Sequence, residues 1–247
     1  MSTPDATHEI PQHVLAAFQL EGTGEPTSPA WDNGRRFGRV VVSPAGPAAA
    51  WSGKVRERLA GTLDGLRISR PVRSTDGRLV VGGFVASEFA EGAPAARVDE
   101  AVAGALLFDA ALEPTEPPAA PTRPDAWAEA DRHVWASERW SGEHVVAHLD
   151  FLASCLFEGS LPPTLAGITP SFEPRPRGFT AALVIVDGLL AGAVDPGVMR
   201  RWAHIPHLGE LAAKALEFRD LTSAGADSNV RSNFTRVSKI VSGIVSG

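Results

Sequence analysis

The segment His148-Leu149-Asp150 places an imidazole and a carboxylate two positions apart, and both groups could do proton or metal chemistry. A carboxylate such as that of Asp150 can deprotonate a substrate hydroxyl or bind a hard cation. In the structural interpretation, His148 hydrogen-bonds backbone groups and Asp150 caps a turn. Sequence spacing alone favours the structural interpretation for both residues.

Other residues of chemically useful type have simpler explanations. Cys155 lies in an apolar stretch and has no convincing His and Asn partners, so we expect a buried small hydrophobe and not a nucleophile. His204, His207 and Glu210 follow one another at intervals of three, which could place them on one helix face around a metal. Pro206 interrupts that helix, so we expect no metal site there.

Composition limits the class of protein. The chain has 247 residues, is 44% hydrophobic, and carries 23 basic against 29 acidic residues for a net charge of -6. This length suits one large domain or two lobes around a cleft. A mildly acidic chain is not expected to bind nucleic acid or an anionic membrane. The polar N-terminal stretch and the single cysteine predict a cytoplasmic protein.

The first ninety residues read as helix, strand, helix and hairpin. Helical spacing covers 11–20 and 48–63, and the β-branched run 39–43 predicts a strand. Two further strand candidates, 66–74 and 78–90, are joined by Asp76-Gly77, a hairpin signal.

The remainder of the chain has mostly helical character. Helices are expected at 97–112, 127–146, 175–193 and 197–221, with a proline-rich connector at 114–124 and a polar, Ser-rich tail. A β-rich start and a helical remainder favour an α+β fold with two lobes, a small lobe at 1–91 and a helical lobe at 92–247.

Several stretches of the chain resemble a kinase-like family of actinobacteria. The stretches are RRFGRVVVSP, RPVRSTDGRLVVGGFVASEFAEG, RVDEAVAGALLFDAAL, HLDFLASCLFEGSLPPTL, ALVIVDGLLAG and RRWAHIPHL. The segment from Ala147 to Pro170 is similar to the catalytic loop and metal-binding strand of the aminoglycoside-phosphotransferase and choline-kinase branch of the protein-kinase-like fold. The resemblance implies a two-lobed fold of that kind.

The resemblance also implies that the usual phosphate-binding lysine is absent. The family places it just before the proline that ends RVVVSP, where this chain has Ser43. A cation about 4 Å from a phosphate oxygen is worth roughly 4 kcal/mol at an effective dielectric constant of about 20. Its loss would slow transfer on the order of a thousandfold unless Arg35, Arg36 or Arg39 replaced it.

Metal binding is reduced in the same comparison. The family's Asn and second Asp correspond to Ser154 and Gly167, which leaves Asp150 as the one carboxylate of the motif. The helix glutamate that normally pairs with the lysine corresponds to Glu57, which would then lack its partner. Magnesium requires oxygen ligands, so we expect Asp150 alone to be insufficient.

Two further features follow from the resemblance. Asp187, in an apolar stretch, corresponds to a helical Asp that braces the catalytic-loop backbone, so we expect a scaffold residue. The glycine-rich phosphate loop of related families is poor here, with Gly34 and Gly38 only, and Trp31 and Phe37 are expected to fill the space.

The sequence therefore predicts a pseudokinase, a kinase-like fold without phosphotransfer that acts as a binding or regulatory module. Its partner would be a protein or a small molecule, and no cofactor is expected. The main alternative is a small-molecule phosphotransferase that uses Asp150 as base, with ATP and magnesium bound atypically. A third alternative is a small-molecule binder in which the former nucleotide cleft has been refilled.

Overall fold

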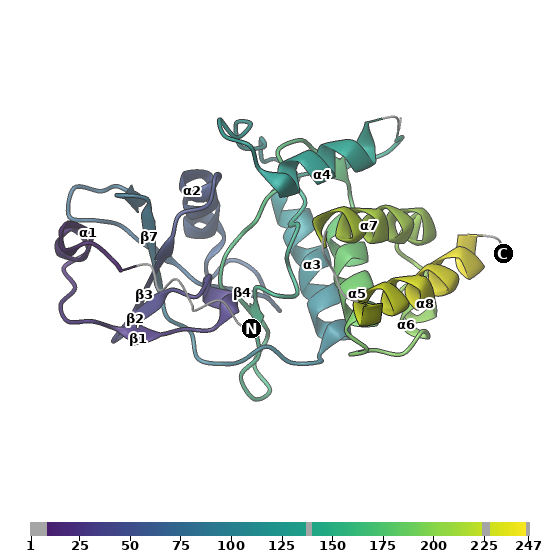
Figure 1. Ribbon diagram of the computed structural model, residues 1–247, viewed down its shortest axis with the longest axis horizontal. Coiled ribbons are helices and arrows are strands. Elements are labelled where there is room, and N and C mark those ends of the chain that lie inside the picture. Colours follow the sequence, from purple (N-terminus) through teal and green to yellow (C-terminus); the bar gives the residue numbers. More distant parts are fainter. Residues whose placement is uncertain (1–8, 137–139, 224–227, 246–247) are drawn as a thin grey trace.

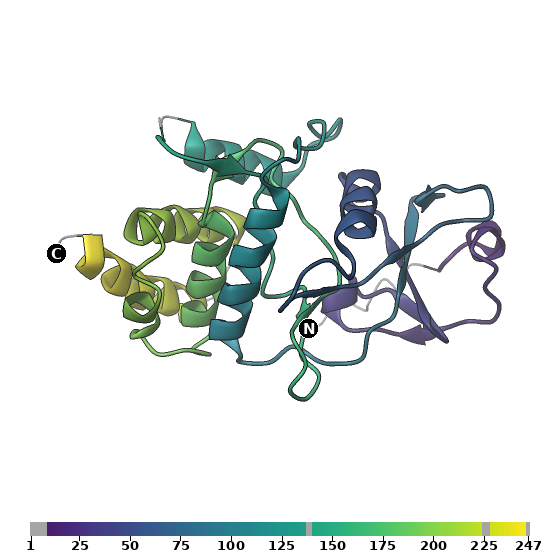
Figure 2. The ribbon, with the colours of Figure 1, turned by 180° about the vertical axis from the view of Figure 1, so that it is seen from behind.

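Two lobes of different character lie side by side in the computed structural model, which describes residues 9–136, 140–223 and 228–245 (Figure 1). One lobe contains a twisted antiparallel sheet with two helices, and the other contains most of the helices. The view from behind shows the same division, with α2 standing between the sheet and the helical lobe (Figure 2). The architecture is an α+β fold with a cleft between two unlike lobes.

The sheet of the first lobe is antiparallel and runs in the order β1-β2-β3-β7-β5, with β6 also paired to β7. Its strands are β1 (Glu25–Pro26), β2 (Arg35–Phe37), β3 (Val40–Pro44), β5 (Pro71–Val72), β6 (Val80–Val81) and β7 (Phe84–Glu88). The period-two alternation of β3 sends Val42 toward α1 (Gln12–Ala17) and Val41 toward the helical lobe. Ser43 is thereby turned to the cleft side of the sheet.

A second small sheet and a small apolar cluster connect the lobes. Strand β4 (Arg67–Ile68) pairs in parallel with β10 (Thr164–Leu165), which pairs with β9 (Cys155–Leu156). The cluster contains Ala30, Trp31, Val41, Leu156 and Ala166, from both lobes. The chain passes from β7 to α3 through residues 89–97, where the division predicted after residue 91 lies.

Helix α5 (Phe179–Leu190) is the centre of the helical lobe. All of its residues from Phe179 to Val186 are buried, because α3 (Val98–Leu112), α7 (Leu208–Thr222) and α8 (Ser228–Val245) pack around it. The remaining elements are α2 (Ala49–Leu59), α4 (Ala126–Trp135), α6 (Val198–Arg201), β8 (His144–Val145), β11 (Arg175–Pro176) and the short 3-10 helix η1 (Pro29–Trp31). Because other helices pack around α5, its one acidic residue, Asp187, is held on a rigid helix.

In the helical lobe, three predicted helices are shorter than expected or divided in two. The helix predicted over 127–146 ends at Trp135, and Gly142, at φ +126°, precedes β8. The helix predicted over 175–193 begins at Phe179, because Arg175 and Pro176 form strand β11 and Gly178 is a left-handed N-cap. His207, at φ +57°, follows Pro206 and separates α6 from α7.

The hairpin and the tail also differ from expectation. The predicted strand 66–74 is divided between two sheets, and Asp76-Gly77 closes a turn that leads back to β7 through β6. The Ser-rich tail is helix α8, whose Val237 and Val241, four residues apart, are buried. Among the described residues, no helix has the length and apolarity needed to cross a bilayer.

Candidate functional site in the cleft

A cavity of about 340 Å³ lies between the two lobes. The sheet lobe contributes η1, the end of β3, the start of α2 and part of β7, with the polar residues Asp32, Ser43, Ser52, Arg56 and Ser87. The helical lobe contributes the segments 149–154 and 166–172 and the start of α4, with the polar residues Asp125, Ser154 and Thr169. The cavity therefore brings together three predicted positions, Ser43, Ser154 and Gly167.

His148 is held between two backbone groups of the loop. It is completely buried, its Nδ1 lies 3.0 Å from the Asp150 amide, and its Nε2 lies 3.0 Å from the Gly167 carbonyl. Since Nδ1 accepts a hydrogen bond, Nε2 carries the proton and donates it. Burial lowers the pKa of His148 to about 4, so the ring is neutral near pH 7. This arrangement matches the structural interpretation of His148.

Asp187 braces the loop through an arginine. Arg219 donates from Nε and Nη2 to the Asp187 carboxylate at 2.6 Å each, and from Nη2 to the Leu149 carbonyl at 2.9 Å. Burial raises the pKa of Asp187, and the neighbouring Arg219 opposes this shift. Asp187 thus acts as a scaffold residue, by way of Arg219 and not by direct contact with the backbone.

A further hydrogen-bond chain reaches the loop from α3. The hydroxyl of Thr180 donates to Asp109 at 2.6 Å and accepts from the His148 amide at 3.1 Å. The other oxygen of Asp109 accepts from the Gly178 amide at 2.9 Å, at the start of α5. The loop is therefore fixed from both α3 and α7, which gives it a well-defined shape.

Asp150 does not cap the turn as predicted. Its carboxylate lies 3.5 Å from Nη2 of Arg219, and about a third of its side chain is exposed. Burial raises the pKa of Asp150 to about 6, although Arg219 opposes the shift. The positive charge of Arg219 attracts this carboxylate away from the loop's own amides.

Gly167 marks an empty place in the helical-lobe wall of the cavity. A Cβ built on Gly167 would meet no heavy atom within 4 Å, and the residue has no positive φ. The space could hold a carboxylate, but glycine supplies none. Ser154, on the same wall, offers a neutral hydroxyl, so neither of these two positions supplies the anionic ligand that magnesium prefers.

Glu57 lies outside the cavity, and the prediction that it has no partner is wrong. Its carboxylate forms a two-bond ion pair with Arg73 at 2.6 Å on the surface of the sheet lobe. The buried face of α2 instead carries Ser52, Val55, Arg56 and Leu59. Sequence reasoning missed Arg56, although those residues follow the i, i+3, i+4, i+7 spacing of a buried helix face.

Arg56 extends from α2 into the junction of the lobes. It is 4% exposed, and its Nη1 donates to the carbonyls of Ser69 and Ala166 and to the hydroxyl of Ser87 at 3.0–3.3 Å. Burial lowers the pKa of Arg56 to about 10, which keeps it charged near neutral pH. The chain therefore places a cation in the cleft, but supplies it from a helix and not from strand β3.

The turn after η1 places an indole and a carboxylate at the cleft. Trp31 is buried and stacks on Phe89, with ring centroids 5.7 Å apart and the planes 29° apart. Asp32, at φ +52°, lines the cavity, and burial raises its pKa. Trp31 fills space as predicted, whereas Phe37 packs with α1 on the other side of the sheet.

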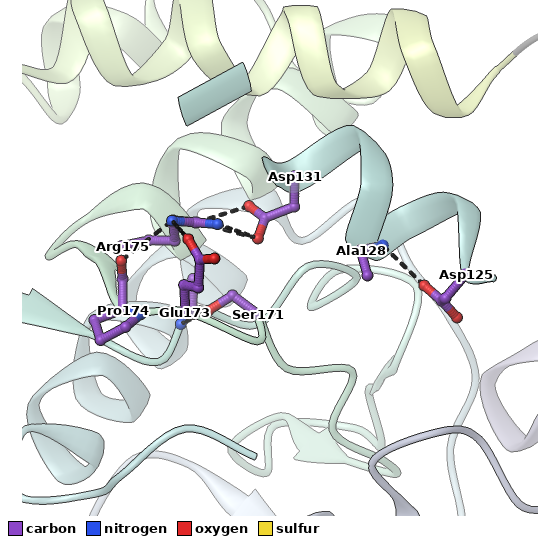
Figure 3. Close-up of polar contacts among 8 residues, drawn as sticks. Asp125, Ala128, Asp131, Ser171, Glu173, Pro174 and Arg175 are labelled. Atoms are coloured by element: carbon purple, nitrogen blue, oxygen red, sulfur yellow. Dashed lines mark hydrogen bonds and ion pairs between the residues drawn. The ribbon is translucent and has the colours of Figure 1, made fainter. Parts of the chain in front are cut away.

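The rim of the cavity at α4 is held by a buried ion pair. Arg175 donates from Nε and Nη2 to the Asp131 carboxylate at 2.7–3.1 Å, and Glu173 lies 3.2 Å from Nη1 (Figure 3). Asp125, at the other end of the same helix, accepts from the Ala128 amide at 2.8 Å as the N-cap (Figure 3). The Asp125 carboxylate at the rim therefore already accepts a hydrogen bond within the protein.

The remaining chemical candidates lie away from the cavity. Cys155 is buried in the main core, and burial raises its pKa to about 12. His204 packs against Trp202, while Nδ1 of His207 lies 3.8 Å from Glu210. The described residues contain no group of three or more His, Cys, Asp and Glu side chains arranged to hold a metal ion.

Comparisons with known proteins identify the fold. No family model and no curated protein matches the chain. Among solved structures, the chain is similar to an aminoglycoside phosphotransferase from Alicyclobacillus acidocaldarius, with a TM-score of 0.52 and 14% identity over 94% of this chain and 92% of that one. At this identity the likeness concerns the fold alone. The chain has the two-lobed, protein-kinase-like fold of the aminoglycoside-phosphotransferase type, which confirms the predicted fold class.

Proposed function

We propose that this protein is a pseudokinase, a kinase-like fold that binds a ligand in its cleft and does not transfer phosphate. The observation that carries the proposal is the set of side chains at the cavity. Ser43, Ser154 and Gly167 line it together, and none provides a cation or a carboxylate. Phosphoryl transfer depends on holding the phosphates and neutralising their charge, and these residues can do neither for a magnesium-bound triphosphate.

The residues at the site do not fit a magnesium ion. Asp150 is the carboxylate that the resemblance retains at the loop, and it lies against Arg219. Burial raises its pKa, and Asp187 and Asp32 are near enough to raise it further. Magnesium takes near-octahedral oxygen coordination and usually one or two carboxylates along with the substrate phosphates. With Gly167 in place of a second carboxylate, the loop leaves Asp150 without a partner for holding the ion.

Space at the inner end of the cleft supports the same proposal. The Trp31 indole stacks on Phe89 and belongs to the apolar cluster that joins the lobes. Trp31 is 5% exposed and lines the cavity, so its indole occupies part of the space between the lobes. The cavity that remains, about 340 Å³, lies at the lower end of the range of small-molecule pockets.

A small-molecule phosphotransferase is the second candidate, and Asp150 favours it. This carboxylate is partly exposed and sits on a loop whose hydrogen bonds are intact. In that account Asp150 accepts the proton of a substrate hydroxyl. Arg56 would then have to replace the missing strand lysine.

Thermal melting with nucleotide separates the two candidates. A ligand at a hundred times its dissociation constant adds about 2.7 kcal/mol to the free energy of unfolding. We expect no change in melting temperature with millimolar ATP and magnesium. A magnesium-dependent increase that disappears in Asp150→Asn would instead establish the phosphotransferase.

A further inference from the structure

Arg56, on the cavity wall of the sheet lobe, has N–H donors without an acceptor among the described residues. All three hydrogen bonds of Arg56 to the described part of the chain come from Nη1. Among the same residues Nε is buried without any partner, and Nη2 makes no hydrogen bond either but is not closed off from solvent as Nε is. A guanidinium has five N–H donors, and buried donors without acceptors are costly. Arg56 lines the cavity, so a ligand there can supply the missing acceptors.

The N-terminus of α2 faces the same cavity. Pro47, Ala48, Ala49 and Ser52 line it, and the amide of Ser52 bonds to the carbonyl of Ala48. The amides of Ala50 and Trp51 precede that bond and have no backbone acceptor in the described ranges of the chain. The first turn contains no acidic side chain that would neutralise this end of the helix. Such a terminus attracts anions.

The charge of Arg56 is only partly balanced within the protein. Among the described residues, no carboxylate forms an ion pair with it within 4.0 Å. Asp32 is the nearest lining carboxylate in electrostatic terms, since each of the two residues shifts the pKa of the other. The second lining carboxylate, Asp125, is engaged as the N-cap of α4. An entering anion would therefore compete mainly with Asp32.

We propose that the cavity binds a small organic oxyanion, a phosphate monoester or a carboxylate, without a metal ion. Its oxygen atoms lie between Nη2 of Arg56 and the N-terminus of α2, with the hydroxyls of Ser43 and Ser52 beside them. This inference rests on the proposed function, because it requires a cleft that is free of a bound metal and triphosphate. It adds the chemical class of the ligand and the residue that recognises it.

The first test measures binding of inorganic phosphate and of acetate at constant ionic strength, in the absence of divalent ions. Nuclear magnetic resonance reports the shifts of the Ala50 and Trp51 amides and of the Arg56 Nε–H. We expect saturable shifts in the wild-type protein and roughly tenfold or weaker binding in Arg56→Met, the loss expected for a charge-assisted hydrogen bond. Comparison of the two anions identifies the preferred oxyanion.

Arg58→Met is the matched control. Arg58 lies on the same helix, is exposed, and donates to Thr115 on the surface. It removes the same charge two residues away without touching the cavity, so binding should be unchanged. Equal weakening in Arg56→Met and Arg58→Met would show a general charge effect and overturn the proposal.

Two further variants keep the test valid if Arg56→Met fails to fold. Asp32→Asn removes the competing carboxylate and suits the left-handed backbone at φ +52°, so anion binding should become severalfold tighter. Ala49→Glu places an acid in the first turn, which favours the helix but repels the ligand, so binding should weaken about tenfold. Changes of the opposite sign, or none, would overturn the proposal.

Failure of this inference is distinguishable from failure of the proposed function. If neither phosphate nor acetate binds, the oxyanion site is wrong, and the absence of phosphotransfer is unaffected. If phosphate binds only with magnesium, the metal-free site is overturned, and the melting experiment with ATP then decides the function.

Discussion

Behind the helical-lobe wall of the cavity, His148 and Arg219 bond to the lining residues Gly167 and Leu149, and Asp187 pairs with Arg219. On the sheet-lobe wall, Arg56 leaves Nε and Nη2 without partners in the described chain. The first wall contains the loop where a kinase would carry out its chemistry. The second contains the surface where a kinase would hold the phosphates. The structural supports of the loop are thus present, and the proposed pseudokinase would keep them without transferring phosphate.

The two walls also differ in how they use glycine. Gly34, below β3, is so close to the strand that an added Cβ would lie 2.4 Å from the Val42 carbonyl oxygen. A Cβ added at Gly167 would meet no heavy atom within 4 Å. One glycine is required by packing, and the other leaves a position vacant that packing would allow to be filled. Packing therefore does not require a glycine at position 167.

The largest expected effect comes from the hydrogen-bonded group of Asp187 and Arg219 behind the helical-lobe wall. Arg219→Met leaves the carboxylate of Asp187 buried without its partner, which should lower the free energy of unfolding by about 3 kcal/mol. Urea denaturation measures the change. Arg201→Met, which breaks surface pairs with Asp99 and Asp195, is the control and should have a much smaller effect. Equal losses would mean that the loop is not specially braced.

The second-largest expected effect distinguishes Gly34 from Gly167. Gly34→Ala should cost about 1–3 kcal/mol because β3 must move away from the new methyl group. Gly167→Asp should change the free energy of unfolding by less than about 1 kcal/mol, because its side chain enters open space. The same urea titrations measure both. A larger loss in Gly167→Asp would contradict the empty place in the helical-lobe wall.

The pH dependence of His148 gives a smaller but more local test. Its pKa is about 4 in the folded protein and about 6.5 when unfolded, so the unfolded state binds more protons between these values. This group should therefore lower stability by about 1.4 kcal/mol per unit as the pH falls from about 6.5 to 4. Asp109 and Asp150, with pKa values raised to about 6, act in the opposite direction over part of that range.

Because these contributions overlap, the ring of His148 should be observed directly by nuclear magnetic resonance. Its signals, assigned by their absence in His148→Gln, should remain those of a neutral imidazole until the pH approaches about 4. A midpoint near 6.5 would show that the ring is accessible to solvent and that the loop is loosely held.

The fold was predictable because its signals are repeated along the chain. The β-branched run of β3, the apolar stretch of α5 and the ordered family stretches all indicated two unlike lobes. Element boundaries were less predictable, since single residues such as Gly142 and His207 end helices by adopting positive φ. Helix α8 was missed because its buried positions, Val237 and Val241, are few among polar residues.

Individual site positions were predictable where the chain itself fixes them. Ser43, Ser154 and Gly167, which the family resemblance identified, line the cavity together. Arg56 and Glu57 show the limit of such prediction, because one step along α2 turns a side chain by about 100°. Nothing in the sequence indicated that Glu57 pairs with Arg73 on the surface. Long-range partners such as Arg219 for Asp187 depend on packing between α5 and α7.

The central claim is that the cleft cannot hold a triphosphate with its divalent ion. Electron paramagnetic resonance with manganese(II) in place of magnesium tests it directly, because the spectrum of the manganese–ATP complex changes when a protein supplies ligands. We expect the spectrum to be the same with and without the protein. A protein-bound spectrum that requires ATP and disappears in Asp150→Asn would contradict the account.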